Sequence, residues 1–196
     1  MTTVVVGGHS RKVGKTSVTA GLIRAFSEYD WTAIKISSHW HAGDVPAEDA
    51  DLNRICSIRE EKNREGNSDT SRFLAAGAAR SFWVRIKGNG LEAAMERLHP
   101  ILQSSPFVII ESNAILRFIR PDLCILVLRY DVEDFKESAR ELLRQAHAAV
   151  AFGRGSSTPS WEGMANAALT GVPQFSPDDL GIMPAEFIGW VAARLR

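Results

Sequence analysis

Short apolar runs alternate along this chain with segments whose apolar residues recur at helical spacing. Such alternation indicates strands followed by amphipathic helices. The runs predict strands over 3–6, 31–36, 81–86, 107–110, 123–128, 149–152 and 172–175. The segments between them predict helices over 13–29, 69–79, 91–102, 132–146 and 184–195. The run at 123–128 is apolar at every position, which is typical of a strand covered on both faces.

This order of elements predicts an α/β fold. We expect a three-layer, doubly wound and mostly parallel sheet of about seven strands, alternating with about six helices. A chain of 196 residues suits one domain over 1–196. The segment 37–68 interrupts the alternation and is densely charged from Glu48 to Glu65. We expect it to be a mobile excursion over the active-site edge, helical around 47–58; the alternative is a solvated surface helix without a role.

A glycine-rich turn joins the first predicted strand to the first predicted helix. It reads Gly-Gly-His-Ser-Arg-Lys-Val-Gly-Lys-Thr-Ser over 7–17. This layout is typical of a phosphate-binding loop, in which backbone N–H groups and a helix N-terminus surround phosphate oxygens. Lys15 would reach the β- and γ-phosphates as a catalytic residue, and the Thr16 hydroxyl would ligate Mg²⁺. The nucleotide contacts expected from the loop are Gly8, Arg11, Lys12, Val13, Gly14, Lys15, Thr16 and Ser17.

Three further residues lie where a doubly wound sheet collects its ligands, at the carboxyl ends of strands. Glu111 directly follows the run 107–110 and is a candidate Mg²⁺ ligand, with a surface glutamate as the alternative. Lys35 lies near the end of an apolar strand, and we expect it to face an anion in a catalytic role rather than to extend into solvent at an edge. Asp69 begins a predicted helix, as a second Mg²⁺ ligand or as a simple N-cap.

Several polar residues have open roles. His39 and His41 would face one way on an extended segment, as a metal pair, as substrate contacts or as part of a solvated loop. Arg11 and Lys12 would screen phosphate, hold a second anion or remain solvated. Ser112 and Asn113 would bind phosphate or substrate, or form a simple turn.

Composition excludes several classes of partner. The net charge is zero, so we expect neither nucleic acid nor a membrane surface as a partner. The two cysteines, Cys56 and Cys124, have no paired-ligand spacing, which favours reduced buried thiols over a disulfide or zinc. Neither a signal peptide nor a membrane-spanning run is evident, so we expect a cytoplasmic location.

The motifs resemble two related families. Gly8-x5-Gly14-Lys15-Thr16 resembles the phosphate loop of dethiobiotin synthetase and of the cobyrinic acid amidating synthases, although its first interval is five residues where the usual phosphate loop has four. This resemblance implies that Thr16, Asp69 and Glu111 hold Mg²⁺ and that Lys35 lies near the substrate. The middle of the chain is similar to the MobB adaptor of molybdopterin-guanine-dinucleotide biosynthesis. The similar stretches are Ile34-Lys35-Ile36, His39-Trp40-His41, Asp69-Thr70-Ser71-Arg72 and Ala76-Gly77-Ala78.

The chain also departs from both families. Val13 and Ser112 replace residues that are small in MobB-like loops, and the substrate loops of dethiobiotin synthetase are not matched at 35–36 and 111–114. The guanine-reading tetrad Asn-Lys-x-Asp is absent after 149–152, so the choice between ATP and GTP stays open.

The function hypothesis is a Mg²⁺-dependent nucleotide-binding protein with weak hydrolysis, a MobB-like adaptor in molybdenum cofactor biosynthesis. Its alternatives are an ATP-dependent small-molecule synthetase or kinase and a non-catalytic nucleotide switch. The resemblance further implies a cofactor-biosynthesis protein as partner and a homodimer.

Overall fold

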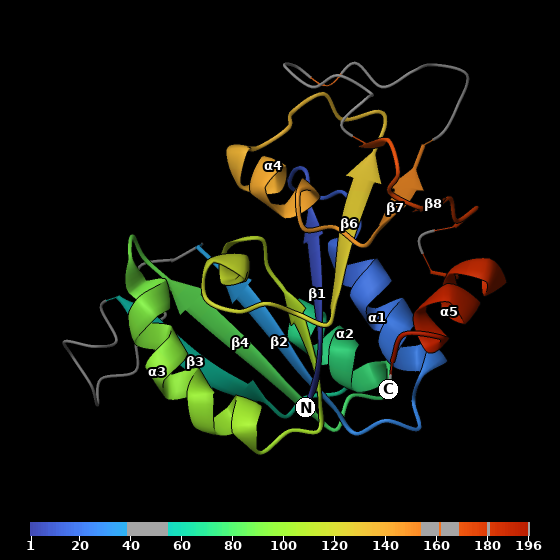
Figure 1. Ribbon diagram of the computed structural model, residues 1–196. Coiled ribbons are helices and arrows are strands. Elements are labelled where there is room, and N and C mark those ends of the chain that lie inside the picture. Colours follow the sequence, from blue (N-terminus) through green and yellow to red (C-terminus); the bar gives the residue numbers. More distant parts are fainter. Residues whose placement is uncertain (39–54, 154–160, 162–168, 180, 196) are drawn as a thin grey trace.

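A single eight-stranded sheet runs through the protein (Figure 1), whose computed structural model describes residues 1–38, 55–153, 161, 169–179 and 181–195. The strands are β1 (Thr2–Gly8), β2 (Trp31–Ser37), β3 (Cys56–Glu61), β4 (Arg80–Ile86), β5 (Phe107–Glu111), β6 (Leu123–Arg129), β7 (Ala148–Phe152) and β8 (Gln174–Phe175). Their order across the sheet is β3-β4-β2-β5-β1-β6-β7-β8. All neighbouring strands pair in parallel except β3, which is antiparallel to β4.

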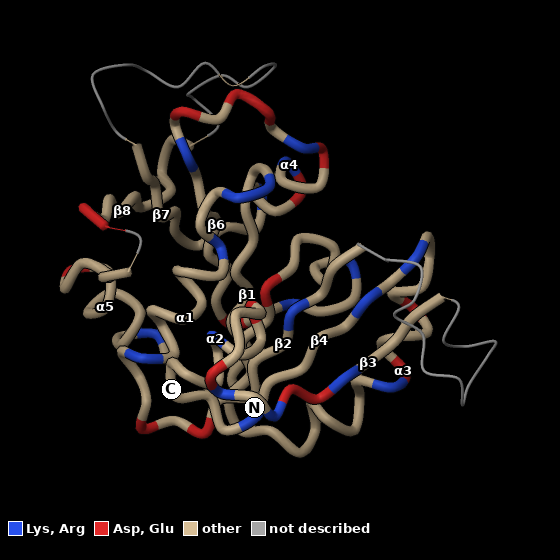
Figure 2. Tube along the Cα trace, turned by 180° about the vertical axis from the view of Figure 1, so that it is seen from behind, with Lys and Arg blue, Asp and Glu red and all other residues tan. Residues whose placement is uncertain are grey.

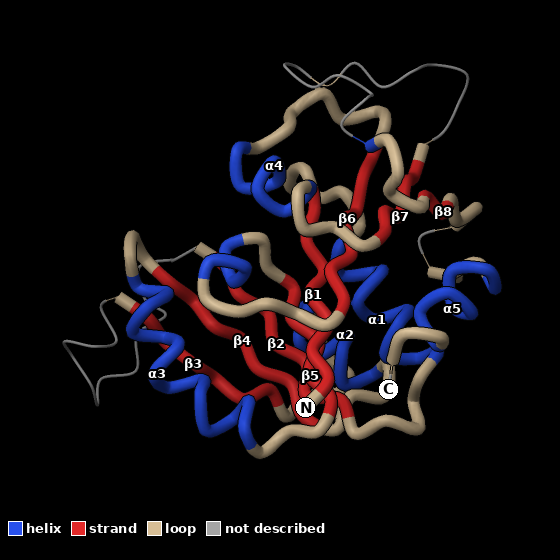
Figure 3. Tube along the Cα trace, in the orientation of Figure 1, coloured by secondary structure: helices blue, strands red, loops and turns tan. Residues whose placement is uncertain are grey.

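Helices cover both faces of the sheet, which gives three layers (Figure 3). They are α1 (Lys15–Ala25), α2 (Asp69–Ala75), α3 (Gly90–Gln103), α4 (Glu137–Leu143) and α5 (Ala185–Ala192), with a short 3-10 helix at Ala114–Arg117. One apolar core joins the sheet to α3, α4 and the 3-10 helix, and a second joins it to α1, α2 and α5. The expected fold class, a mostly parallel three-layer α/β sheet, is therefore confirmed.

Strand alternation explains how these cores are built. In β1, Val5 belongs to the core under α3 and α4, while Val4 and Val6 belong to the core under α1 and α2. Central strands such as β6 are buried along nearly their whole length, as their unbroken apolar sequence requires. Because β1 is flanked by β5 and β6, the loop that follows it emerges near the middle of the carboxyl edge.

The structure corrects the expectation for part of the segment 37–68. Residues 56–58 belong to β3, not to a helix, and they pair antiparallel with the outer side of β4. β3 is an edge strand, and its charged side chains remain near solvent. The rest of the expected helix, and most of the expected mobile excursion, lies outside the described residues.

The remaining differences concern the ends of elements. The helix expected over 13–29 begins only at Lys15, and the helix expected over 132–146 is limited to α4. Strands β1, β2 and β5 extend one or two residues further than expected, so Glu111 is the last residue of β5. Lysine and arginine are interspersed with aspartate and glutamate along the described part of the trace (Figure 2). Across the described residues, no helix is both long and apolar enough to cross a membrane.

Candidate functional site

The loop after β1 makes a tight turn whose backbone requires glycine at both ends. Gly14, which precedes the first residue of α1, has a φ of 103° in the left-handed region, where a side chain would be strained. Lys12 has a φ of 57°, and it is the one residue other than glycine with positive φ in the described chain. A Cβ on Gly8 would lie 2.7 Å from Cγ2 of Val13, too close for any other residue. The glycines at both ends of the loop are therefore required by its shape.

Asn113 anchors the beginning of this loop. Its Oδ1 accepts the N–H of Gly8 at 2.9 Å, and its Nδ2 donates to the carbonyl of Gly8, also at 2.9 Å. The same Nδ2 donates to Oγ of Ser138 at 3.2 Å, which links the loop to α4. The Gly8 amide is thus occupied by a side chain from the end of β5.

His9 anchors the other side of the loop, although its side chain is fully buried. Its Nδ1 donates to the carbonyl of Asp134 at 2.8 Å, and its Nε2 accepts the N–H of Arg129 at 3.0 Å. These two partners require the neutral imidazole with its proton on Nδ1. Burial lowers the pKa of His9, and the nearby Lys15 lowers it further. The ring also lies against Phe135 and Trp161, so it is a packing residue of the loop.

Lys15 closes over the loop. Its ammonium donates to the carbonyl of Ser10 at 2.7 Å. Burial lowers the pKa of Lys15, Glu111 opposes this shift, and the cations Lys35 and Lys136 add to it. A cation held among other cations favours an anionic ligand, because the ligand relieves both burial and repulsion.

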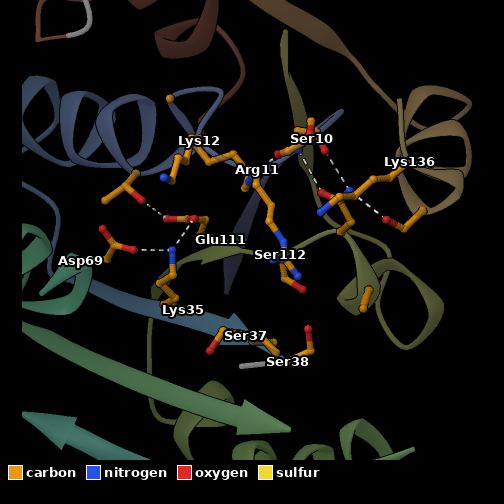
Figure 4. Close-up of a pocket in the computed structure, with 18 of the residues that line it drawn as sticks. Ser10, Arg11, Lys12, Lys35, Ser37, Ser38, Asp69, Glu111, Ser112 and Lys136 are labelled. Carbon is orange, nitrogen blue, oxygen red and sulfur yellow. Dashed lines mark hydrogen bonds and ion pairs between the residues drawn. The ribbon is translucent and has the colours of Figure 1, made fainter. Parts of the chain in front are cut away.

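Glu111, Lys35 and Asp69 form an ion cluster beside the loop (Figure 4). Lys35 and Glu111 are register neighbours on β2 and β5, so their side chains emerge on the same face of the sheet. Lys35 Nζ lies 2.6 Å from Oε1 of Glu111 and 2.5 Å from Oδ2 of Asp69. The Thr16 hydroxyl donates to the second oxygen of Glu111 at 2.8 Å. One ammonium is therefore held by two carboxylates next to a hydroxyl.

The residues of this cluster can be compared with the ligands that Mg²⁺ prefers. Burial alone would lower the pKa of Lys35, but the charges of Glu111 and Asp69 outweigh it and raise this pKa. The carboxylates thus stabilise a cation between them, as a Mg²⁺ site must. Among the described residues, no three His, Cys, Asp or Glu side chains lie so that they could together hold a metal ion. The oxygen donors fit Mg²⁺, which takes few protein ligands and keeps water and phosphate oxygens.

A cleft of about 700 Å³ opens over these residues. Its lining includes six lysine and arginine side chains but only two carboxylates, and six serines contribute hydroxyls. These residues are Arg11, Lys12, Lys15, Lys35, Arg72, Lys136, Asp69, Glu111, Ser10, Ser17, Ser37, Ser38, Ser112 and Ser138. Because the whole protein is neutral, this excess of positive charge is local and suits an anionic ligand.

The structure gathers most of the residues that sequence predicts for a site. Ten of the predicted site residues line the cleft: Gly8, Arg11, Lys12, Gly14, Lys15, Thr16, Ser17, Lys35, Asp69 and Glu111. Val13 is different, because its side chain is completely buried in the core under α1. Ser68, not Asp69, is the N-cap of α2, since its hydroxyl accepts the N–H of Ser71. His39 and His41 lie outside the described residues.

Sequence reasoning missed three contributors. Arg72 donates to the hydroxyl of Ser17 at 3.2 Å and lies 3.8 Å from Asp69, so it joins α2 to α1. Lys136 and Ser138 come from the start of α4, far along the chain. Arg72 belongs to the stretch Asp69-Thr70-Ser71-Arg72, which resembles MobB, but the sequence gave it no role in the site. Nothing in the sequence indicates that 136–138 packs beside the loop 8–17.

Solved structures that resemble this one at low sequence identity include LpxK and HypB. LpxK from Aquifex aeolicus, in a complex with ATP, is 18% identical with a TM-score of 0.50, over 90% of this chain and 53% of its own. HypB from Helicobacter pylori, in a complex with nickel, is 16% identical with a TM-score of 0.51, over 98% of this chain and 86% of its own. These likenesses show a shared fold, a mostly parallel α/β sheet with helices on both faces. This chain spans about half the length of LpxK. No protein-family model and no curated protein sequence matches the chain.

Proposed function

We propose that this protein binds ATP or GTP together with Mg²⁺ at the loop 8–17. The observation that carries the proposal is the meeting of Lys15, Thr16 and Glu111 in one cationic cleft at the carboxyl edge of the sheet. The N-terminus of α1 and the loop amides suit phosphate oxygens. Lys15 would exchange its Ser10 carbonyl for a phosphate oxygen.

Thr16, Glu111 and Asp69 would hold the metal, directly or through water. Mg²⁺ would neutralise charge on the phosphate oxygens. Lys35 now occupies the space between the two carboxylates, so it competes with Mg²⁺ there. With nucleotide bound, Lys35 would pair with phosphate, where its charge favours phosphoryl transfer.

Within this class we propose a MobB-like adaptor in molybdenum cofactor assembly, with slow hydrolysis. Its support is the sequence resemblance at 34–36, 69–72 and 76–78. A second candidate is an ATP-dependent synthetase or kinase that acts on a small molecule. The cleft favours this candidate, because it continues from the phosphate loop to Ser38 and Ile86 and so leaves room for an acceptor. The single domain over 1–196 belongs to both proposals.

Binding of fluorescent ATP and GTP analogues with Mg²⁺ tests the shared proposal. Lys15→Ala should weaken binding by about tenfold or more, because it removes a charge-assisted hydrogen bond. Thr16→Ala should reduce the gain in affinity that Mg²⁺ provides. Lys87→Ala, which removes an exposed charge in the β4–α3 turn, is the matched control and should bind as the wild type does. Equal affinity in the Lys15→Ala and wild-type proteins would refute the proposal.

Turnover separates the two candidates. Kinases typically turn over at about 1–100 per second. Phosphate release far below this rate with every small carboxylate and amine supplied favours the adaptor. A rate in that range with one acceptor favours the synthetase or kinase.

A further inference from the structure

Of the cations that line the cleft, Arg11, Lys12 and Lys136 have no hydrogen bond or ion pair to the residues that the structure describes. Arg11 extends from the phosphate loop into the cavity, and Lys136 enters it from the start of α4 (Figure 4). Among the described residues, neither side chain has a hydrogen bond or an ion pair. Lys12, Lys35 and Arg72 line the same cleft, but the last two are bound to carboxylates.

The two charges are close enough to repel each other. Burial lowers the pKa of Lys136, and the positive charge of Arg11 lowers it further, against a weaker opposing effect of Asp134. Asp134 is already the acceptor of the Ser10 hydroxyl at 2.5 Å. Two like charges that face one cavity are unfavourable unless an anion lies between them.

The surrounding groups are suited to an oxyanion. Ser138 accepts from Asn113, and its own hydroxyl proton has no acceptor within the described chain. The Ser112 hydroxyl accepts the N–H of Ile115 at 3.4 Å, which also leaves its proton without an acceptor in the described parts. The cleft therefore combines two cations with two hydroxyl donors, the groups that bind phosphate or carboxylate.

Arg11 is among the nucleotide contacts that the sequence predicts, but the triphosphate has enough other partners to bind without this pair. The triphosphate already has Lys15, the loop amides and the first turn of α1, and Mg²⁺ would bind on the side of Glu111 and Asp69. Lys136 lies across the cleft from that ion cluster, as Figure 4 shows. A second anionic group would balance the charge of Arg11 and Lys136 there.

We propose that Arg11 and Lys136, with Ser112 and Ser138, form a second anion subsite that holds a phosphate or carboxylate group of an acceptor beside the nucleotide. This inference rests on the proposed function and names the chemical class of its second ligand. A small molecule with an oxyanion would be oriented by the subsite next to the terminal phosphate.

Calorimetry on protein saturated with Mg²⁺ and a β,γ-imido triphosphate tests the subsite, because the phosphate loop is then filled. Inorganic phosphate and succinate are titrated separately up to 10 mM, which distinguishes a phosphate from a carboxylate ligand. We expect one of them to bind, and Arg11→Gln and Lys136→Gln each to weaken it by about tenfold or more. Lys136→Arg should retain binding, and the surface variant Lys87→Gln should match the wild type.

The outcomes separate this inference from the proposed function. Absence of nucleotide binding by the wild type would refute the proposed function. Nucleotide binding without binding of either added anion would refute the subsite alone. A third outcome is that the wild type binds neither added anion and that Arg11→Gln and Lys136→Gln lose affinity for the imido triphosphate. The pair would then contact the terminal phosphate, and this result would also overturn the subsite. Thermal unfolding of each variant checks that it is folded.

Discussion

The ion pair of Lys35 and Glu111 should be strongly coupled in the absence of Mg²⁺. Their charged atoms lie 2.6 Å apart, and the side chains are only 19% and 3% exposed. Two unit charges 4 Å apart attract by about 4 kcal/mol at the effective dielectric constant of partly buried pairs. Glu111→Gln removes one charge from a nearly isosteric side chain, and Lys35→Met removes the other.

Each single substitution leaves an imbalance in the cluster. Removal of one partner of a buried pair costs about 3–5 kcal/mol, because the other charge remains buried. Lys35 retains Asp69 as a second partner, so we expect Glu111→Gln to cost about 2–3 kcal/mol, below that range. Lys35→Met leaves two carboxylates facing each other and should cost a similar amount. The double variant should be destabilised by about 2 kcal/mol less than the sum of the two.

Urea unfolding at pH 7.5 without Mg²⁺ measures this coupling. The control is the double-mutant cycle of Glu60 and Arg80, whose more exposed pair at 3.0 Å should couple by less than about 1 kcal/mol. Added Mg²⁺ should stabilise Lys35→Met more than the wild type, since the competing ammonium is gone, and should not stabilise Glu111→Gln. Additive costs at Lys35 and Glu111, within about 0.5 kcal/mol, would refute the reasoning.

Three other perturbations test separate parts of the structure. The folded protein keeps His9 neutral because burial lowers its pKa, whereas the unfolded chain takes up a proton below pH 6.5. Stability should therefore fall from pH 7.5 to 5.5, with at most about 1.4 kcal/mol per pH unit from this group, and His9→Gln should lose that part of the slope in urea titrations. Burial raises the pKa of Cys124 to about 12, so a thiol reagent at pH 8 should label it only after unfolding; rapid labelling of the native protein would contradict its placement. Gly14→Ala should cost about 1–2 kcal/mol in urea unfolding, because φ is 103° there, whereas Gly189→Ala in α5, with open space around it, should be neutral or stabilising.

The sequence alone determined the sheet and the position of the loop. Apolar runs predicted seven of the strands, because most positions of a strand covered on both faces are apolar. The glycines and the Gly14-Lys15-Thr16 sequence located the loop, since the backbone disfavours a side chain at Gly8 and Gly14. The strand β3 was missed because an edge strand with charged residues has no unbroken apolar run.

Tertiary structure decided which distant residues meet. Lys35 and Glu111 are separated by 76 positions and become neighbours only because β2 and β5 pair in register. The sequence predicted that each of these residues lies at the carboxyl end of a strand. It did not predict that the two strands are neighbours, since strand order depends on packing across the whole sheet. The roles of His9, Asn113 and Lys136 depend in the same way on the packing of 129–138 beside the loop. Local sequence determines the glycine-rich loop, whereas the bonds of Asn113 and His9 that anchor it connect residues more than a hundred positions apart.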